Sequence, residues 1–379
     1  MSNPHIIQIE YGTLVGQRPR EAGCNARLAV HGLNVNVPLA RITTDDGATG
    51  FGPCRTTMGD ASELLGVPLQ DLLKPAKGVV DHATAFEFPL WDLVGHRTGK
   101  AVYQLLAEAA GNKVITPFRV PCYDTSLYID DLHLDDNAAA AALIAEEARF
   151  GYEHNHRSFK IKVGRGARHM AVAKGTDRDI AVIHAVRDAV GPEAHIMIDA
   201  NNGYTLNLAK QVLSETADCN LFWLEEAFHE DRVLYADLRE WLDKEGLAVL
   251  IADGEGQASP TLLDWAKEGV VDVIQYDIFS YGLTHWLRTG AQLDGWNVRS
   301  APHHYGRHVG NYIAGHLAAA IKNFTFVEWD EVTTPGLDAS AYRVEDGHVL
   351  VPNAPGFGLR LEEARFQAAV AQTGFALKL

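Results

Sequence analysis

Five acidic residues and one histidine end short apolar runs in the second half of the chain, and these residue types bind metals and move protons. They follow one another at intervals of roughly 22 to 30 residues, the length of a strand, a helix and two short loops. The six residues are Asp199, Glu225, Glu255, Asp277, His303 and Glu328. Polar residues at the carboxyl ends of strands in a parallel β/α barrel face one active site, so the spacing predicts that these side chains converge.

The first three carboxylates predict a metal site. Asp199, Glu225 and Glu255 end three successive predicted strands, and carboxylate oxygens with water suit an octahedral hard cation such as Mg²⁺. Any one of these acids could instead cap a helix or be solvated, but three in consecutive units favour the metal. Glu226 and Asp253 stay open as alternatives, because side chains alternate along a strand and only one of each close pair should face the ion.

Two lysines supply a candidate base. Lys160 and Lys162 lie two residues apart on a predicted strand and therefore share a face. Phe159, before the pair, and Ile161, between the two lysines, would face the surrounding helices. Both lysines would then point inward. Two ammonium groups beside a divalent cation disfavour each other's protonation, so we expect one to be neutral near neutral pH and able to take a proton.

Asp277 and His303 predict a second acid/base group. An aspartate that is hydrogen-bonded to one imidazole nitrogen fixes the tautomer and raises the basicity of the other nitrogen. His304 is adjacent to His303, and either could be the partner. Glu328, which ends the last predicted strand, could orient a substrate oxygen.

The elements that must position these residues follow from the patterning. Residues 4–52 are rich in predicted strands and residues 60–108 are predicted helices, which indicates a separate α+β domain. From about residue 118 strands and helices alternate strictly, giving eight strands with at most seven complete helices. The tail is strand-like and rich in turns. We expect an N-terminal α+β capping domain (1–117), a catalytic barrel (118–334) and a C-terminal segment that packs back on the cap (335–379).

Together these residues resemble the enolase superfamily, and within it the mandelate racemase-like group, over nearly the whole chain. The resemblance implies a modified TIM barrel, (β/α)7β, beneath an N-terminal α+β capping domain. It implies that Lys162 is the base of the Lys-x-Lys motif and Lys160 its first lysine. It also implies that the strand-end residues described above are Mg²⁺ ligands, an Asp–His dyad and a last-strand glutamate, with Asn201 nearby. Ala227 departs from the proline that the family commonly has there.

This set of residues predicts removal of the α proton of a hydroxy-carboxylate through an enediolate that the metal stabilises. We expect an acid-sugar dehydratase, a lyase that gives a 2-keto-3-deoxy acid. A racemase or epimerase of a 2-hydroxy acid, with Lys162 and His303 on opposite faces, remains the alternative. The segments Gly16–Cys24 and Cys54–Asp60 are expected to be lid loops, whose arginines could contact substrate oxygens. These arginines are Arg18, Arg20 and Arg55.

Composition narrows the class of protein. A formal net charge of −16 over 379 residues argues against a nucleic-acid partner or an anionic membrane surface. The four cysteines form no C-x-x-C pair, which favours reduced thiols. The N-terminus does not have the pattern of a signal peptide, and no apolar run reaches the length of a transmembrane helix. We therefore expect a cytoplasmic homo-oligomer with a small carboxylate substrate.

Overall fold

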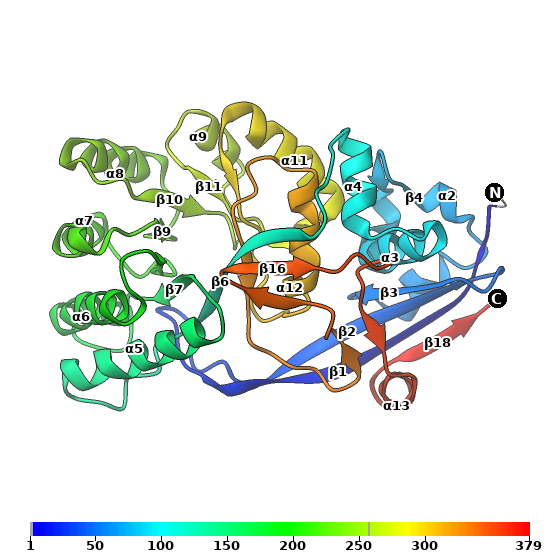
Figure 1. Cartoon of the computed structure of the whole chain (residues 1–379), viewed down its shortest axis with the longest axis horizontal. Helices are drawn as coiled ribbons and strands as arrows, with labels where there is room; N and C mark the ends of the chain where they lie inside the picture. Colours follow the sequence, from blue (N-terminus) through cyan, green and yellow to red (C-terminus); the bar gives the residue numbers. More distant parts are fainter. Residues whose placement is uncertain (1–2, 257) are drawn as a thin grey trace.

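The computed structural model describes residues 3–256 and 258–379. Figure 1 shows a β/α barrel, surrounded by the green and yellow helices, next to a sheet of blue strands that the red C-terminal strand completes. A long hairpin from that sheet extends across to the barrel. Among the described helices, none has the length and apolar character needed to cross a bilayer.

Within the described residues, eight parallel strands form the barrel, and the first seven pair with one another in chain order. They are β6 (Phe118–Leu127), β7 (Ser158–Lys162), β8 (His195–Asp199), β9 (Trp223–Glu225), β10 (Leu250–Asp253), β11 (Val273–Ile274), β12 (Arg299–Ser300) and β13 (Val327–Trp329). The ring closes because β13 pairs in parallel with β6 and a parallel bridge joins Ser300 to Phe324. The predicted eight-stranded barrel is confirmed.

Helical segments follow each of the first seven barrel strands. They are α5 (Asn137–Glu153), α6 (Val172–Val190), α7 (Leu206–Glu215), α8 (Arg232–Glu245), α9 (Leu262–Lys267), α10 (Ile278–Tyr281) with α11 (Leu283–Trp296), and α12 (Gly310–Ile313) with the 3₁₀ turn η4 (Ala314–Ala319). The strand after β13 is β14 (Leu337–Asp338), outside the barrel. This arrangement is the (β/α)7β barrel that the resemblance implied.

The helix α8 illustrates how the sequence sets these elements. It begins where the side chain of Asp231 accepts hydrogen bonds from the backbone N–H groups of Val233 and Leu234, at 2.8 and 3.1 Å. It ends at Gly246, whose φ of 69° suits glycine. Its buried residues, Tyr235, Leu238 and Leu242, recur at helical spacing and turn one face of the helix toward the barrel.

The cap is an antiparallel sheet covered by short helices. Its strands are ordered β18-β1-β2-β3, with β1 (Ile6–Ala22), β2 (Gly32–Thr44), β3 (Thr49–Pro53) and β18 (Phe375–Lys378). Its helical segments are α1 (Met58–Ser62), α2 (Leu69–Leu72), η1 (Asp81–Phe86), α3 (Glu87–Thr98) and α4 (Val102–Ala110), and a small hairpin is formed by β4 (Leu73–Lys74) and β5 (Gly78–Val79). This strand-then-helix order is the predicted α+β cap.

The C-terminal residues return to both other parts of the molecule. The strand β16 (His348–Val351) pairs antiparallel with β6 and with β15 (Arg343–Glu345), while β17 (Arg360–Leu361) pairs with β14. The helix α13 (Glu363–Thr373) packs on β1, where a Cβ at Gly12 would lie 2.7 Å from the backbone nitrogen of Val370. The division of the chain at 117/118 and 334/335 stays a prediction.

The prediction that Gly16–Cys24 is a loop is wrong for most of that segment. Residues 16–22 continue β1, and Gln17 pairs with Asn34 of β2. On its other side the Gln17 N–H donates to the carbonyl of Thr333 at 2.8 Å, so its backbone is bonded to the barrel side as well. The segment Cys54–Asp60 runs from coil into α1, which Thr57 caps. A strand hairpin, rather than a loop, therefore reaches the barrel mouth.

Candidate metal centre and active site

The structure brings Asp199, Glu225 and Glu255 together. Each offers a carboxylate oxygen, and the three oxygens lie within 4.8 Å of one another. Asp199 and Glu225 are directly paired residues at the ends of β8 and β9, and both are fully buried. Glu255 follows Asp253, the last residue of β10, after Gly254. An all-oxygen set of this kind fits Mg²⁺.

The two alternative acids are engaged elsewhere. The carboxylate of Glu226 accepts hydrogen bonds from the side-chain amides of Asn201 and Asn202, at 3.1 and 3.3 Å. Asp253 is hydrogen-bonded to the hydroxyl of Tyr235 on α8, and so points into the layer between strand and helix. Both strands end at these positions, and the left-handed backbone of Glu226 (φ 41°) and of Gly254 (φ 114°), which separates Asp253 from Glu255, turns the side chains in different directions.

Two buried oxygen atoms in this cluster lack a hydrogen-bond donor among the described residues, which supports the fit to a hydrated cation. Two donors, the Trp223 indole at 3.0 Å and the Gln275 amide at 2.8 Å, hold Oε2 of Glu225. Among the described residues, Oε2 of Glu255 and Oδ1 of Asn201 are buried without a hydrogen-bond partner. A buried oxygen without a donor is costly, and a cation or its water would satisfy both atoms.

Both lysines point inward among these acids. Lys160 Nζ lies 2.6 Å from Oε1 of Glu225 and 3.3 Å from Oε1 of Glu328, and Lys162 Nζ contacts Oδ2 of Asp199. Burial alone would lower the pKa of each lysine, but the surrounding carboxylates, chiefly Glu225 for Lys160 and Asp199 for Lys162, raise both pKa values. The protein groups by themselves therefore favour two protonated lysines, whereas we expected one neutral lysine. The attraction of the carboxylates outweighs the repulsion between the two ammonium groups.

His303, rather than His304, contacts the aspartate. His303 Nδ1 lies 3.2 Å from Oδ2 of Asp277, and its Nε2 lies 3.5 Å from Oε2 of Glu255, on the side of the carboxylate cluster. Burial would lower the pKa of His303, but the carboxylates of Glu255, Glu328 and Asp277 raise it to about 9. Asp277 is itself fixed as the N-cap of α10 and by Arg307 at 3.0 Å.

His304 and Glu328 link the last two barrel strands. The His304 backbone N–H donates to Oε2 of Glu328 at 2.7 Å, and its ring Nε2 is bonded to the Glu328 carbonyl. Thr125 Oγ1 donates to Oε1 of Glu328 at 2.8 Å. A Cβ at Gly310 would overlap the His304 ring, so this histidine is closely packed. Its position suits a structural role.

The arginines mainly bind the protein itself. Arg18 lies 3.2 Å from Asp330, and Arg20 lies 2.6 Å from Asp130 and 3.1 Å from Glu147. These pairs join β1 to the barrel, so their guanidinium groups are largely engaged. Arg55 is exposed, directly after β3 and the buried Cys54.

Three aromatic residues that the sequence reasoning missed form a cluster, which meets Lys162 through Tyr128. The ring centroid of Tyr128 is 5.6 Å from Lys162 Nζ, 4.8 Å from the Tyr305 centroid and 5.0 Å from that of His31. Burial, together with the charges of Arg18 and Lys162, lowers the pKa of His31 to about 4. Tyr128 directly follows β6, so its strand-end position could have identified it, and Tyr305 directly follows the His303–His304 pair that the sequence had already indicated. His31 lies in the hairpin loop, for which the sequence holds no such signal.

Comparisons with known proteins agree with this geometry. A family model described as enolase C-terminal domain-like matches residues 140–365. A magnesium complex of a galacturonate dehydratase point mutant from Geobacillus sp. is 48% identical, covers 100% of this chain and 98% of its own, and superposes with a TM-score of 0.97. The same enzyme complexed with D-galacturonate and 5-keto-4-deoxy-D-galacturonate is 48% identical over 100% of both chains, with a TM-score of 0.95.

A more distant curated relative is arabinonate dehydratase from Saccharolobus solfataricus. It is 23% identical over 377 residues, which cover 90% of this chain and 93% of the relative. The family model alone spans more than half of the chain. The chain belongs to the mandelate racemase/muconate lactonizing enzyme family of the enolase superfamily.

Proposed function

We propose that the chain is a Mg²⁺-dependent acid-sugar dehydratase that acts on a hexuronate of the D-galacturonate type. The observation that carries this proposal is the carboxylate cluster, with Lys162 against Asp199 and His303 against Glu255. The substrate class is supported by the similarity to the enzyme from Geobacillus sp. whose structure holds D-galacturonate and its 5-keto-4-deoxy derivative.

The proposed reaction removes water across two neighbouring carbons. In a hexuronate the carboxylate is C6, so the acidic α proton is on C5 and the departing hydroxyl is on C4. Loss of that proton and that hydroxide gives an enol, which takes a proton at C4 and becomes the 5-keto-4-deoxy acid. Counted from the carboxylate, this product has the same arrangement as the 2-keto-3-deoxy acid expected from the sequence.

The chain's own residues account for the proton transfers. Lys162 would take the α proton on one side of the substrate when a cation held by Asp199 offsets the carboxylate charge that otherwise raises the pKa of this lysine. His303, held by Asp277 through Nδ1, presents Nε2 and delivers a proton to the departing hydroxyl, which leaves as water. Lys160, enclosed by Glu225 and Glu328, supplies a fixed positive charge where the substrate carboxylate gathers negative charge.

The metal contributes one further effect. When bound to Asp199, Glu225 and Glu255, Mg²⁺ supplies Lewis-acid stabilisation of the negative charge on the substrate carboxylate. The Tyr128, Tyr305 and His31 side chains exclude water from the Lys162 side. Water exclusion strengthens the interactions of the charged groups with the reacting atoms.

The test is turnover in D₂O with Mg²⁺ and D-galacturonate, with D-arabinonate and D-xylonate as competing acid sugars. We expect a keto acid from the uronate with the highest kcat/KM of the three, and deuterium at C4 of the product. A hexuronate recovered with deuterium at C5 and inverted stereochemistry, without any keto acid, would instead identify a racemase or epimerase.

A further inference from the structure

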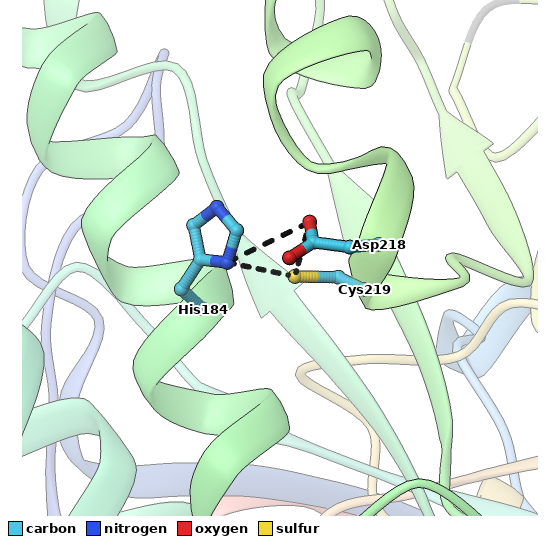
Figure 2. Close-up of side chains that lie close together, drawn as sticks. All are labelled: His184, Asp218 and Cys219. Carbon is cyan, nitrogen blue, oxygen red and sulfur yellow. Dashed lines mark hydrogen bonds and ion pairs between the residues drawn. The ribbon is translucent and has the colours of Figure 1, made fainter.

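A second cluster of metal-binding side chains lies outside the proposed active site. His184 on α6 faces Asp218 and Cys219 of the 3₁₀ turn η3 (Ala217–Cys219), as Figure 2 shows. This turn joins α7 to β9 ahead of the strand, whereas Glu225 ends that strand. We propose that His184, Asp218 and Cys219 form a separate site for one zinc-type divalent cation, with water completing the coordination.

The spacing of the three ligand atoms suits a small tetrahedral ion. His184 Nδ1 lies 3.2 Å from Cys219 Sγ and 3.9 Å from Oδ1 of Asp218, and Sγ lies 3.9 Å from the same Oδ1. Zinc bonds of about 2.0–2.3 Å at tetrahedral angles place ligand atoms about 3.3–3.6 Å apart. Each separation is within about half an ångström of that range, so small side-chain rotations would suffice.

The histidine already presents the correct nitrogen. Its Nε2 lies 3.1 Å from the carbonyl oxygen of Glu215. A carbonyl can only accept, so Nε2 carries the proton and Nδ1 directs its lone pair at Asp218 and Cys219. Metal-binding histidines commonly donate their second N–H to such an acceptor, which fixes the tautomer and the ring orientation.

The turn that carries the other two ligands is held firmly against α6. Arg187, on the same helix as His184, donates from Nε to the Cys219 carbonyl at 2.9 Å and from Nη1 to the Ala194 carbonyl at 2.8 Å. Cys219 is buried, whereas Asp218 is exposed and His184 partly so. An ion could therefore enter from solvent and meet a thiol whose position is fixed.

The ligand types separate this site from the carboxylate cluster. Thiolate and imidazole favour zinc-type ions, whereas three carboxylates favour Mg²⁺. A cysteine binds zinc-type ions as the thiolate, so each bound ion should displace the proton of the Cys219 thiol.

The location predicts an effect on stability and none on turnover. The ion would cross-link α6 to the turn preceding β9, at the end of the barrel remote from the catalytic groups. An ion that binds only the folded chain, present at about 100 times its Kd, lowers the unfolding equilibrium constant about 100-fold.

The test uses the full chain with excess Mg²⁺ and measures Zn²⁺ stoichiometry, proton release and the thiolate-to-metal absorbance of bound Co²⁺. We expect about one Zn²⁺ and one released proton per chain, also in an Asp199→Asn background. Cys219→Ser and His184→Ala should lose the ion, the absorbance and the Zn²⁺-dependent rise in Tm. Mg²⁺-supported turnover should stay unchanged, and Cys24→Ser should bind like the wild type.

Asp218→Asn provides a second variant that preserves folding, because its side chain is exposed. It should weaken Zn²⁺ binding at least tenfold while the Tm without zinc stays the same. Zn²⁺ stoichiometry that is unaffected by the His184 and Cys219 substitutions, or Co²⁺ binding without a thiolate band, would overturn the site. The close contact would then be a thiol–imidazole hydrogen bond only.

Discussion

At the scale of single residues, the proposed chemistry depends on how the carboxylate oxygens are shared. Lys160 and Lys162 neutralise Glu225 and Asp199 in the protein alone, while Oε2 of Glu255 lacks a hydrogen-bond donor among the described residues. A divalent ion therefore has to compete with two ammonium groups for the same carboxylates. Loss of any one carboxylate should weaken metal binding more than it weakens the fold.

Chelation should abolish turnover of the acid sugar, and Mg²⁺ should restore it. Glu225→Gln keeps the shape of the side chain but removes a charge that faces the ion, so we expect Mg²⁺ affinity to fall at least tenfold and kcat to fall at least ~100-fold. Calorimetric titration with Mg²⁺ and a keto-acid assay measure both effects. Glu226→Gln is the matched control and should retain metal binding. Equal losses in the two variants would contradict the assignment.

A buried ion pair away from the metal gives a residue-scale prediction for pH. The His156 Nε2 lies 2.8 Å from Glu331, and the side chain is fully buried. Burial would lower the pKa of His156, but the nearby Cys122 side chain and the Glu331 and Asp124 carboxylates raise it to about 10. Between the unfolded value of about 6.5 and this raised value, the folded chain holds one more proton than the unfolded chain.

The stabilisation from His156 is therefore complete below about pH 6.5 and is lost as pH rises through about 10. Within that window His156 should contribute a slope of about −1.4 kcal/mol of unfolding free energy per pH unit. Urea unfolding of the wild type and His156→Gln at several pH values measures this slope. The variant should be less stable near neutral pH and should lose the slope; an unchanged slope would contradict the raised pKa.

At the scale of elements, close approaches between strand and helix fix the cap. Gly50 of β3 meets the backbone of α3 at Leu93, where a Cβ would overlap the helix. A side chain there requires the strand and helix to separate. A Cβ at the neighbouring Gly52 would lie 2.9 Å from the Cβ of Phe88, also in α3. Glycines at these positions therefore set the distance between the cap sheet and α3.

Gly50→Ala should destabilise the chain by about 1–3 kcal/mol through overpacking, measured by urea unfolding. Gly295→Ala is the matched control, because Gly295 lies in α11 with open space around its Cβ position. That substitution should be neutral or should stabilise by about 0.5–1 kcal/mol. If both variants unfold at the same urea concentration as the wild type, the close packing of β3 on α3 does not limit stability.

Elements also mark where prediction from sequence succeeded. The strand ends in the barrel were predictable because each is marked locally in the sequence. A short apolar run forms the buried strand, and an acid such as Asp199 or Glu225 follows it. The strand formed by residues 16–22 could not be predicted, because Arg18, Pro19 and Arg20 interrupt the apolar alternation. Their extended backbone is stabilised by pairing with β2 and with Thr333, which are distant in sequence.

At the scale of the whole molecule, the proposed active site is shared between two parts of the chain. The barrel supplies the carboxylates and the proposed proton-transfer groups, and the cap hairpin places His31 against Tyr128 and Tyr305. The barrel half could be predicted, since each strand carries its own signal. His31 could not, because its position depends on how a hairpin docks onto another part of the molecule.

Arg20 tests whether hairpin docking matters for substrate binding. Its pairs with Asp130 and Glu147 are partly exposed, so Arg20→Met should cost about 1 kcal/mol. We expect KM for the acid sugar to rise roughly fivefold with little change in kcat, because the hairpin must be ordered when substrate binds. Lys100→Met, which removes a pair with Glu108 within the cap, is the control and should leave KM unchanged.

The central claim is that Lys162 and His303 act at different steps on the same substrate. Exchange of the C5 proton of D-galacturonate in D₂O, followed by NMR with Mg²⁺, tests it most directly. His303→Asn should still exchange that proton at a measurable rate but should form no keto acid, whereas Lys162→Ala should do neither. Exchange that survives in Lys162→Ala and disappears in His303→Asn would contradict the account, because the histidine would then be the base.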